Sequence, residues 1–193
     1  MKGMMSWKTL ILGIGLLLIP TATLASTCDG VQFKDTAPGA NGDLVLNGLG
    51  LRKATIFKVK VNVAGLYLPE KSGDAQKILD MKDPWRLELR FVHDVDASDT
   101  KEAVQDGFKR SGVDVSTLKH EIESLVGMFV DFKEGQTLSF ANNPADGVAV
   151  ELNGDARGTI KEANFAKALL AIWLGPNPPN DELKSGLLGG TCD

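Results

Sequence analysis

The residue types that most often carry chemistry are sparse in this sequence. Its two histidines, His93 and His120, lie far apart and neither begins an HExxH pattern, so no zinc site is predicted. Asp94, Asp96 and Asp99 resemble half of a calcium-binding loop, but the glycine and the closing glutamate are missing at the required offsets. The sequence also has no nucleophile elbow, P-loop or dinucleotide fingerprint. We therefore expect no metal ion and no cofactor.

The two cysteines, Cys28 and Cys192, lie near opposite ends of the chain. This spacing excludes a CxxC redox motif and a four-cysteine metal site. Two cysteines in an oxidising compartment most simply pair, and the ends of a domain often lie close together. The sequence therefore predicts a disulfide bond between them, and two free thiols near the ends are the alternative.

The first 25 residues have the pattern of a secretory signal peptide. A lysine-bearing start precedes an unbroken apolar run at 10–19, and small residues follow it. Thr23 and Ala25 occupy the positions that signal peptidase reads, so cleavage is expected after Ala25. The apolar run is short for a membrane span. A retained anchor and lipidation at Cys28 are the alternatives, although Thr27 does not suit a lipoprotein signal. We expect an exported protein, in a bacterial periplasm, with no transmembrane segment after processing.

Composition argues against a nucleic-acid partner. The 193 residues include 21 Lys and Arg against 25 Asp and Glu, a net charge of −4. Removal of the signal peptide takes away Lys2 and Lys8, so the mature chain carries −4 − 2 = −6. Phosphate binding needs a concentrated basic face, which is not seen. Residues 26–193 are predicted to form a single domain, because no linker, repeat or charge run divides them.

Hydrophobic periodicity predicts strands and helices in alternating groups. Period-two alternation is clearest at 57–68 and 85–91, and 3.6-residue spacing is clearest at 116–129 and 164–174. Asn47-Gly48 and Asn153-Gly154 are predicted tight turns. The predicted strands are 31–33, 44–46, 57–68, 85–91, 136–140, 148–152 and 156–160, and the predicted helices are 73–81, 98–111, 116–129, 164–174 and 181–188. This order favours an α+β fold, in which helices pack on one face of a mainly antiparallel sheet.

Three segments resemble the chalcone isomerase-like family, in particular its bacterial exported branch. They are LNGLGLRKATIFKVKVNVAGLYL at 46–68, ELNGDARGTIKEANFAKALLAIWLG at 151–175 and LKSGLLG at 183–189. The first matches the family's Gly-x-Gly-x-Arg bend and the long strand that follows it. The resemblance covers roughly residues 38–190. It implies an open-faced β-sandwich of chalcone isomerase type, in which a cleft between sheet and helices holds a flat or elongated apolar ligand.

The resemblance implies that Arg52 and Asn62 are the ligand-binding residues. Arg52 matches the family arginine that stabilises an oxyanion in the enzymes and pairs with a carboxylate in the fatty-acid binders. A guanidinium stays cationic and its planar fork suits two-oxygen recognition. Asn62 stands where the family carries a hydroxyl that helps this arginine. Without the resemblance, Arg52 reads as a solvated charge at a strand edge and Asn62 as a polar residue on a wet strand face.

The polar residues that orient a chalcone in the plant enzymes are mostly absent. Thr100, Ala103 and Gly107 align with the family's tyrosine, lysine and asparagine. Tyr67 belongs to the end of the long strand and cannot replace that tyrosine. Arg52 alone could polarise an oxygen, but the sequence offers no obvious acid or base beside it.

These observations favour an exported chalcone isomerase-fold protein that binds a small apolar anion, such as a fatty acid, without turnover. The first alternative is an isomerase, an intramolecular lyase of chalcone isomerase type, that acts on an enone-like or other unknown substrate with Arg52 as its electrophile. The second alternative is an envelope protein that works through a protein contact and whose cleft is vestigial.

Overall fold

The computed structural model describes residues 25–54 and 57–192, so the predicted signal peptide lies, except for Ala25, outside the described residues. The strands are β1 (Ala25–Cys28), β2 (Val31–Lys34), β3 (Thr36–Gly39), β4 (Gly42–Ala54), β5 (Val59–Leu68), β6 (Trp85–Phe91), β7 (Thr137–Asn143), β8 (Gly147–Leu152) and β9 (Asp155–Ile160). The helices are α1 (Ala75–Asp80), α2 (Ala97–Arg110), α3 (Lys119–Gly127), α4 (Phe165–Leu174) and α5 (Asp181–Leu187).

Strands β3 to β9 form one seven-stranded antiparallel sheet in which the strand order follows the sequence. β1 and β2 form a separate two-stranded hairpin. The α+β class and the large antiparallel sheet that the sequence predicts are therefore confirmed. Two short strands, β1 and β3, were not predicted from the sequence, because β1 begins at the predicted cleavage site and β3 contains Pro38 and Gly39, residue types that are depleted in strands.

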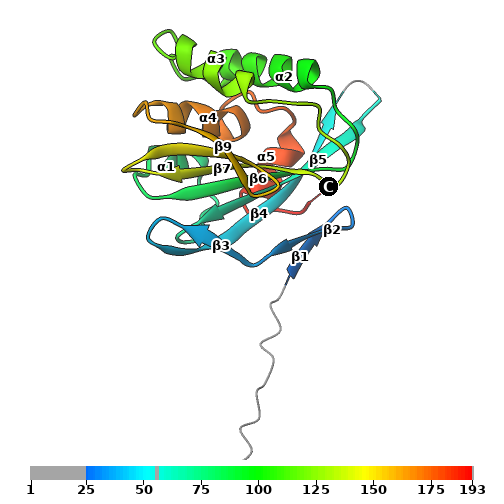
Figure 1. Ribbon diagram of the computed structural model, residues 1–193. Helices are drawn as coiled ribbons and strands as arrows, with labels where there is room; N and C mark the ends of the chain where they lie inside the picture. The colour runs from blue at the N-terminus through cyan, green and yellow to red at the C-terminus, as the bar shows by residue number, and fades with distance from the viewer. Residues whose placement is uncertain (1–24, 55–56, 193) are drawn as a thin grey trace, which may run out of the picture.

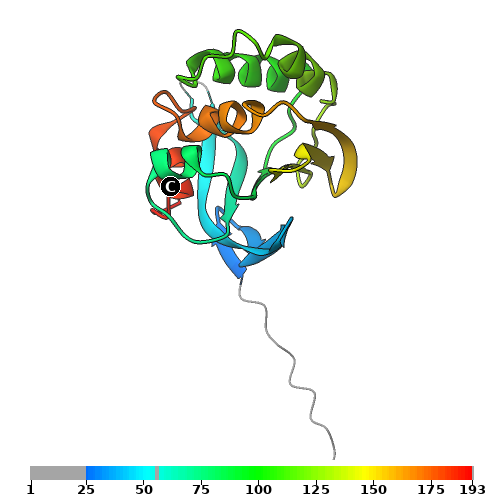
Figure 2. The same cartoon turned by 90° about the vertical axis from the view of Figure 1, so that its left-hand side faces the viewer.

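Helices and a hairpin cover opposite faces of the sheet. Figures 1 and 2 show α4 between the sheet and α2, and the β1–β2 hairpin on the side away from these helices. β5 shows why both faces are covered, because every residue from Val61 to Leu68 is buried. Leu66 and its alternate neighbours join the helix-side core, whereas Val63 and Tyr67 join a second core under the hairpin. The helical layer on one face is as predicted.

One predicted turn is wrong. Asn47 and Gly48 lie inside β4, at a register shift between Leu46 and Gly48, and neither has a positive φ. The predicted turn at Asn153-Gly154 is present, because both residues are left-handed there, with φ of 53° and 87°. The Asn47 side chain explains the difference. Its amide donates to the main-chain oxygens of Ser72 and Leu187, at 3.0 and 2.7 Å, and its Oδ1 accepts from the Ser72 N–H at 2.7 Å.

A disulfide bond joins Cys28 in β1 to Cys192, across 164 positions of the sequence, with a Cα–Cα distance of 5.8 Å. The predicted pairing of the two cysteines is confirmed. It fastens the C-terminal end of the described chain to the β1–β2 hairpin.

No helix among residues 25–54 and 57–192 is long and apolar enough to cross a membrane. Within the same residues, no group of three or more histidine, cysteine or acidic side chains is placed to hold a metal ion.

Candidate functional site

Close backbone packing of α5 on β4 fixes the strand that carries Arg52. A Cβ atom on Gly50 would collide with the main-chain oxygen of Leu183 in α5, and a Cβ on Gly186 would collide with the main-chain oxygen of Leu49. Helix and strand can therefore approach this closely only where both carry glycine. The Gly-x-Gly bend noted in the sequence is thus a helix-docking surface, and Arg52 follows it two residues later.

Arg52 and Asn62 lie directly opposite one another on β4 and β5, and Phe91 of β6 lies opposite Asn62. Residues that pair across antiparallel strands share one face of the sheet. Ala64 and Leu66, at the same parity as Asn62, are in the helix-side core. The sheet therefore brings Arg52 and Asn62 together on the face that the helices cover.

Both residues line a cavity of about 310 Å³ between the sheet and the helical layer. The sheet contributes Leu89 and Phe91 to its walls, and the helices contribute Val104, Ile172 and Trp173. Of the apolar residues of α4, Ile172 and Trp173 line the cavity, whereas Phe165 and Leu169 are wholly buried in the core. The cavity is thus mostly apolar, with the Arg52 guanidinium and the Asn62 amide as polar groups in its wall.

Arg52 has no acidic partner among the residues that the structure describes. No carboxylate of residues 25–54 and 57–192 forms an ion pair with it. Burial lowers the pKa of its guanidinium, and the positive charge of Arg110 lowers it further. An arginine nevertheless stays protonated at physiological pH. The cavity wall therefore carries a partly desolvated positive charge that no described carboxylate neutralises.

Asn62 is 3% exposed, and its side chain makes no hydrogen bond to any residue that the structure describes. Its Oδ1 is buried without a partner. An unsatisfied buried polar atom costs about 1–3 kcal/mol. Oδ1 is an acceptor, so a carboxylate could not satisfy it; only the amide nitrogen of Asn62, which lies opposite Arg52 in the cavity wall, can donate to an anion.

Four further charged or titratable residues in the cavity lining were missed by the sequence analysis: His93, Asp94, Asp99 and Arg110. The cavity that contains Arg52 therefore also contains two acids and a histidine, which the sequence analysis did not place there. β6 ends at Phe91, in line with Asn62 and with Arg52 near the end of β4. The segment after β6 and the first half of α2 therefore come next to the cavity. The antiparallel pairing of β4, β5 and β6 was the feature of the sequence that could have indicated these residues. It does not reveal which residues of α2 face the cavity.

The Asp94 carboxylate is already engaged. It accepts the Glu134 N–H and forms an ion pair with Lys133, each at 2.9 Å. The main-chain hydrogen bond from Glu134, followed by the one from Lys133, lowers its pKa. Asp94 is therefore held as an anion at the edge of the cavity.

The three α2 positions aligned with the polar residues of the plant enzymes differ in what they face. Thr100 and Ala103 line the cavity. Gly107 does not, because it lies against α4, where an added Cβ would be 2.6 Å from Cγ2 of Ile172. An asparagine at position 107 would force α2 and α4 apart. The packing of α2 on α4 thus excludes the third polar residue of the plant enzymes at position 107 of this chain.

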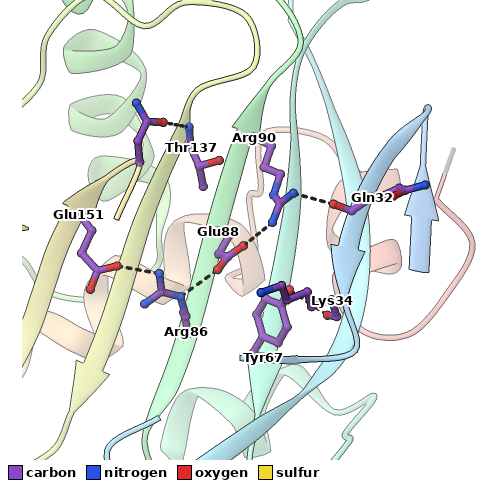
Figure 3. A network of polar contacts seen from close by, with 9 residues as sticks. Gln32, Lys34, Tyr67, Arg86, Glu88, Arg90, Thr137 and Glu151 are labelled. Carbon is purple, nitrogen blue, oxygen red and sulfur yellow. Dashed lines mark hydrogen bonds and ion pairs between the residues drawn. The ribbon is translucent and has the colours of Figure 1, made fainter. Parts of the chain in front are cut away.

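A second polar cluster, on the opposite face of the sheet, contrasts with Arg52 (Figure 3). Glu88 is bonded to both Arg86 and Arg90, at 3.0 and 3.2 Å, and Glu151 is bonded to Arg86 at 2.7 Å. Arg90 also donates to the Gln32 main-chain oxygen at 2.6 Å. Two arginines and two glutamates cancel in charge, so this cluster holds the β1–β2 hairpin and leaves no arginine without a carboxylate.

A seven-stranded antiparallel sheet, covered on one face by helices that enclose an arginine-bearing cavity, defines an α+β protein of the open-faced sandwich type. Residues 25–189 match the chalcone isomerase-like family, and the chain belongs to it. The crystal structure of a fatty-acid binding protein of Arabidopsis thaliana shares the fold, with a TM-score of 0.67 and 15% sequence identity over 86% of this chain and 96% of that chain. No curated protein sequence matches this one significantly.

Proposed function

We propose that this protein binds a small apolar anion, such as a medium-chain fatty acid, in the cavity between sheet and helices, without chemical turnover. The observation that carries the proposal is the unpaired Arg52 in a mostly apolar cavity. A carboxylate would accept two hydrogen bonds from the guanidinium fork, and the Asn62 amide would donate a third. The alkyl chain would then pack against Leu89, Val104 and Trp173.

Cavity size and the structural comparison support this class of ligand. A volume of about 310 Å³ is at the lower end of the range of ligand sites, about 300–1,000 Å³. A medium-length chain therefore fits better than a long one. The Arabidopsis protein that shares the fold is a fatty-acid binding protein.

Titration calorimetry with decanoate tests the proposal. A hydrogen bond to a charged group is worth about 1.5–3 kcal/mol, so Arg52→Gln should weaken binding roughly ten- to a hundredfold. Arg52→Lys should recover part of the affinity, because a point charge cannot reproduce the fork. Asn62→Ala should cost less, about 0.5–1.5 kcal/mol. Arg157→Gln, an exposed residue of β9 outside the cavity, is the matched control and should bind as wild type does.

The proposal fails if Arg52→Gln keeps its fold by circular dichroism and binds decanoate as tightly as wild type. Native mass spectrometry of the purified protein provides an independent check, because a co-purified lipid would support binding.

A second candidate function is an isomerase reaction in the same cavity. The observation that favours it is that His93 and Asp99 line the cavity together with Arg52. A histidine and a carboxylate can move protons while the guanidinium stabilises an oxyanion. Turnover of a chalcone-like enone that is lost in both Arg52→Ala and His93→Ala would establish this function in place of simple binding.

Export to a periplasm is part of the same proposal. Its support is the signal-like segment at 1–25 and the Cys28–Cys192 bond, which is typical of oxidising compartments. Cleavage after Ala25 would remove a single residue of β1 and leave Ser26, Thr27 and Cys28 paired with β2. The intact mass of exported protein decides the point: a mass that retains residues 1–25, or that includes a lipid on Cys28, would contradict it.

A further inference from the structure

Two arginines line the cavity from opposite walls. Arg52 comes from β4 in the sheet, and Arg110 is the last residue of α2 in the helical layer above it. The family resemblance accounts for Arg52 but assigns nothing to Arg110. We propose that Arg110 is a second anion-binding residue, and that the preferred ligand carries a doubly charged head group, as a phosphate monoester on an alkyl tail does. This inference rests on the proposed function, because it uses the same cavity.

Arg110 is available for such a ligand. Asp106, one turn earlier on α2, forms its ion pair with Lys109 at 2.8 Å. Arg110 donates from Nε to the main-chain oxygen of Asp106 at 3.2 Å, and no carboxylate of the described residues forms an ion pair with it. Its terminal nitrogens therefore make no charged contact with the described protein.

Arg52 and Arg110 line the same cavity, and the positive charge of Arg110 is the second cause, after burial, that lowers the pKa of Arg52. A ligand with one negative charge would leave one of these positive charges without compensation. A phosphate brings two charges and at least three acceptor oxygens to a single point, which suits two guanidinium forks that approach from opposite walls.

The two acids in the cavity lining belong to the start of α2 and to the segment before it, whereas Arg110 is at the end of α2. Asp99 is in the first turn of α2, eleven residues before Arg110, which is about 16 Å along the helix axis. Asp94 precedes the helix and is paired with Lys133. The C-terminus of α2 carries about half a negative charge, which the full positive charges of Lys109 and Arg110 outweigh. The cavity is therefore polarised, and its positive end lies between Arg52 and Arg110.

Titration calorimetry with decyl phosphate and with decanoate tests the inference. Wild type should bind decyl phosphate at least about tenfold more tightly than decanoate at neutral pH. Arg110→Gln should lose about tenfold for decyl phosphate and less than about threefold for decanoate. Arg157→Gln, which removes an exposed positive charge of β9 outside the cavity and leaves the Lys109–Asp106 pair intact, should bind both ligands as wild type does. The preference should shrink towards pH 5, because the second phosphate ionisation lies near pH 6.

Three results would overturn the inference: equal affinity of wild type for both ligands, an equal loss for both in Arg110→Gln, or an equal effect of Arg157→Gln and Arg110→Gln. If decanoate binding depends on Arg52 but decyl phosphate binds no more tightly than decanoate, the inference about Arg110 fails and the proposed function stands. If neither ligand binds, the proposed function fails with it. Arg110 is exposed at a helix end, so the variant should fold, as circular dichroism will verify.

Discussion

Replacing Asn47 by alanine should lower the free energy of unfolding by about 3 kcal/mol. Asn47 is 5% exposed, and its side chain makes three hydrogen bonds of 2.7–3.0 Å to main-chain groups of Ser72 and Leu187. Each such bond contributes about 1 kcal/mol net, and alanine would leave one N–H and two carbonyl oxygens without these partners. The bonds connect β4, the segment after β5 and the end of α5. Their loss should loosen the docking of α5 that fixes the strand leading to Arg52.

Urea denaturation measures this change directly. In thermal melts, 1 kcal/mol corresponds to about 2–4 °C for a chain of this size, so the midpoint should fall by roughly 6–12 °C. Asn142→Ala is the matched control, because that amide makes one long bond, 3.4 Å, to the Asp83 main-chain oxygen at the surface. It should change stability by less than about 0.5 kcal/mol. If Asn47→Ala loses no more than Asn142→Ala, the three bonds do not hold α5 to the strand.

Three further predictions concern packing and covalent structure. Serine at both Cys28 and Cys192 should give a folded protein that is about 5 kcal/mol less stable, from the loop entropy of 164 residues; equal melting of oxidised and reduced wild type would contradict this. Gly50→Ala should destabilise by several kcal/mol, because its Cβ would meet the main chain of α5, whereas Gly127→Ala, with open space around it, should be neutral or stabilising in the same melts. Glu88→Gln should cost about 2–3 kcal/mol, because Arg90 loses its one carboxylate partner among the described residues and the largely buried Arg86 keeps only Glu151; a loss below about 0.5 kcal/mol in urea denaturation would show that the cluster is not needed.

Elements whose pattern is set by local geometry were predicted well from the sequence. β6 runs from Trp85 to Phe91, with the bounds that its alternation predicts, because side chains on a strand alternate between faces. α4 was likewise predicted to within one residue at its start. The turn at Asn153-Gly154 formed, and the hydrogen bonds that join Asn153 to Thr137 of the neighbouring strand β7 are compatible with its left-handed backbone.

Features that depend on distant partners could not be predicted. Asn47-Gly48 has the same composition as the real turn, but its partner, Leu187, lies 140 positions away, and the glycine is needed for the approach of α5. The side of β5 that carries Asn62 was predicted from its lysines to face solvent, whereas the helices bury it. The face that Arg110 turns to the cavity depends on how α2 crosses the sheet, which its own 3.6-residue pattern does not specify.

The bond between Cys28 and Cys192 makes almost the whole described chain a covalent ring. A single proteolytic cut anywhere within this ring, for instance beside the exposed Phe57, leaves one molecule of nearly unchanged mass, and the two pieces separate only after reduction. The ring also cannot close before residue 192 has been synthesised. A chain truncated ahead of that residue would therefore lack the ring altogether, even if it retained every strand of the sheet.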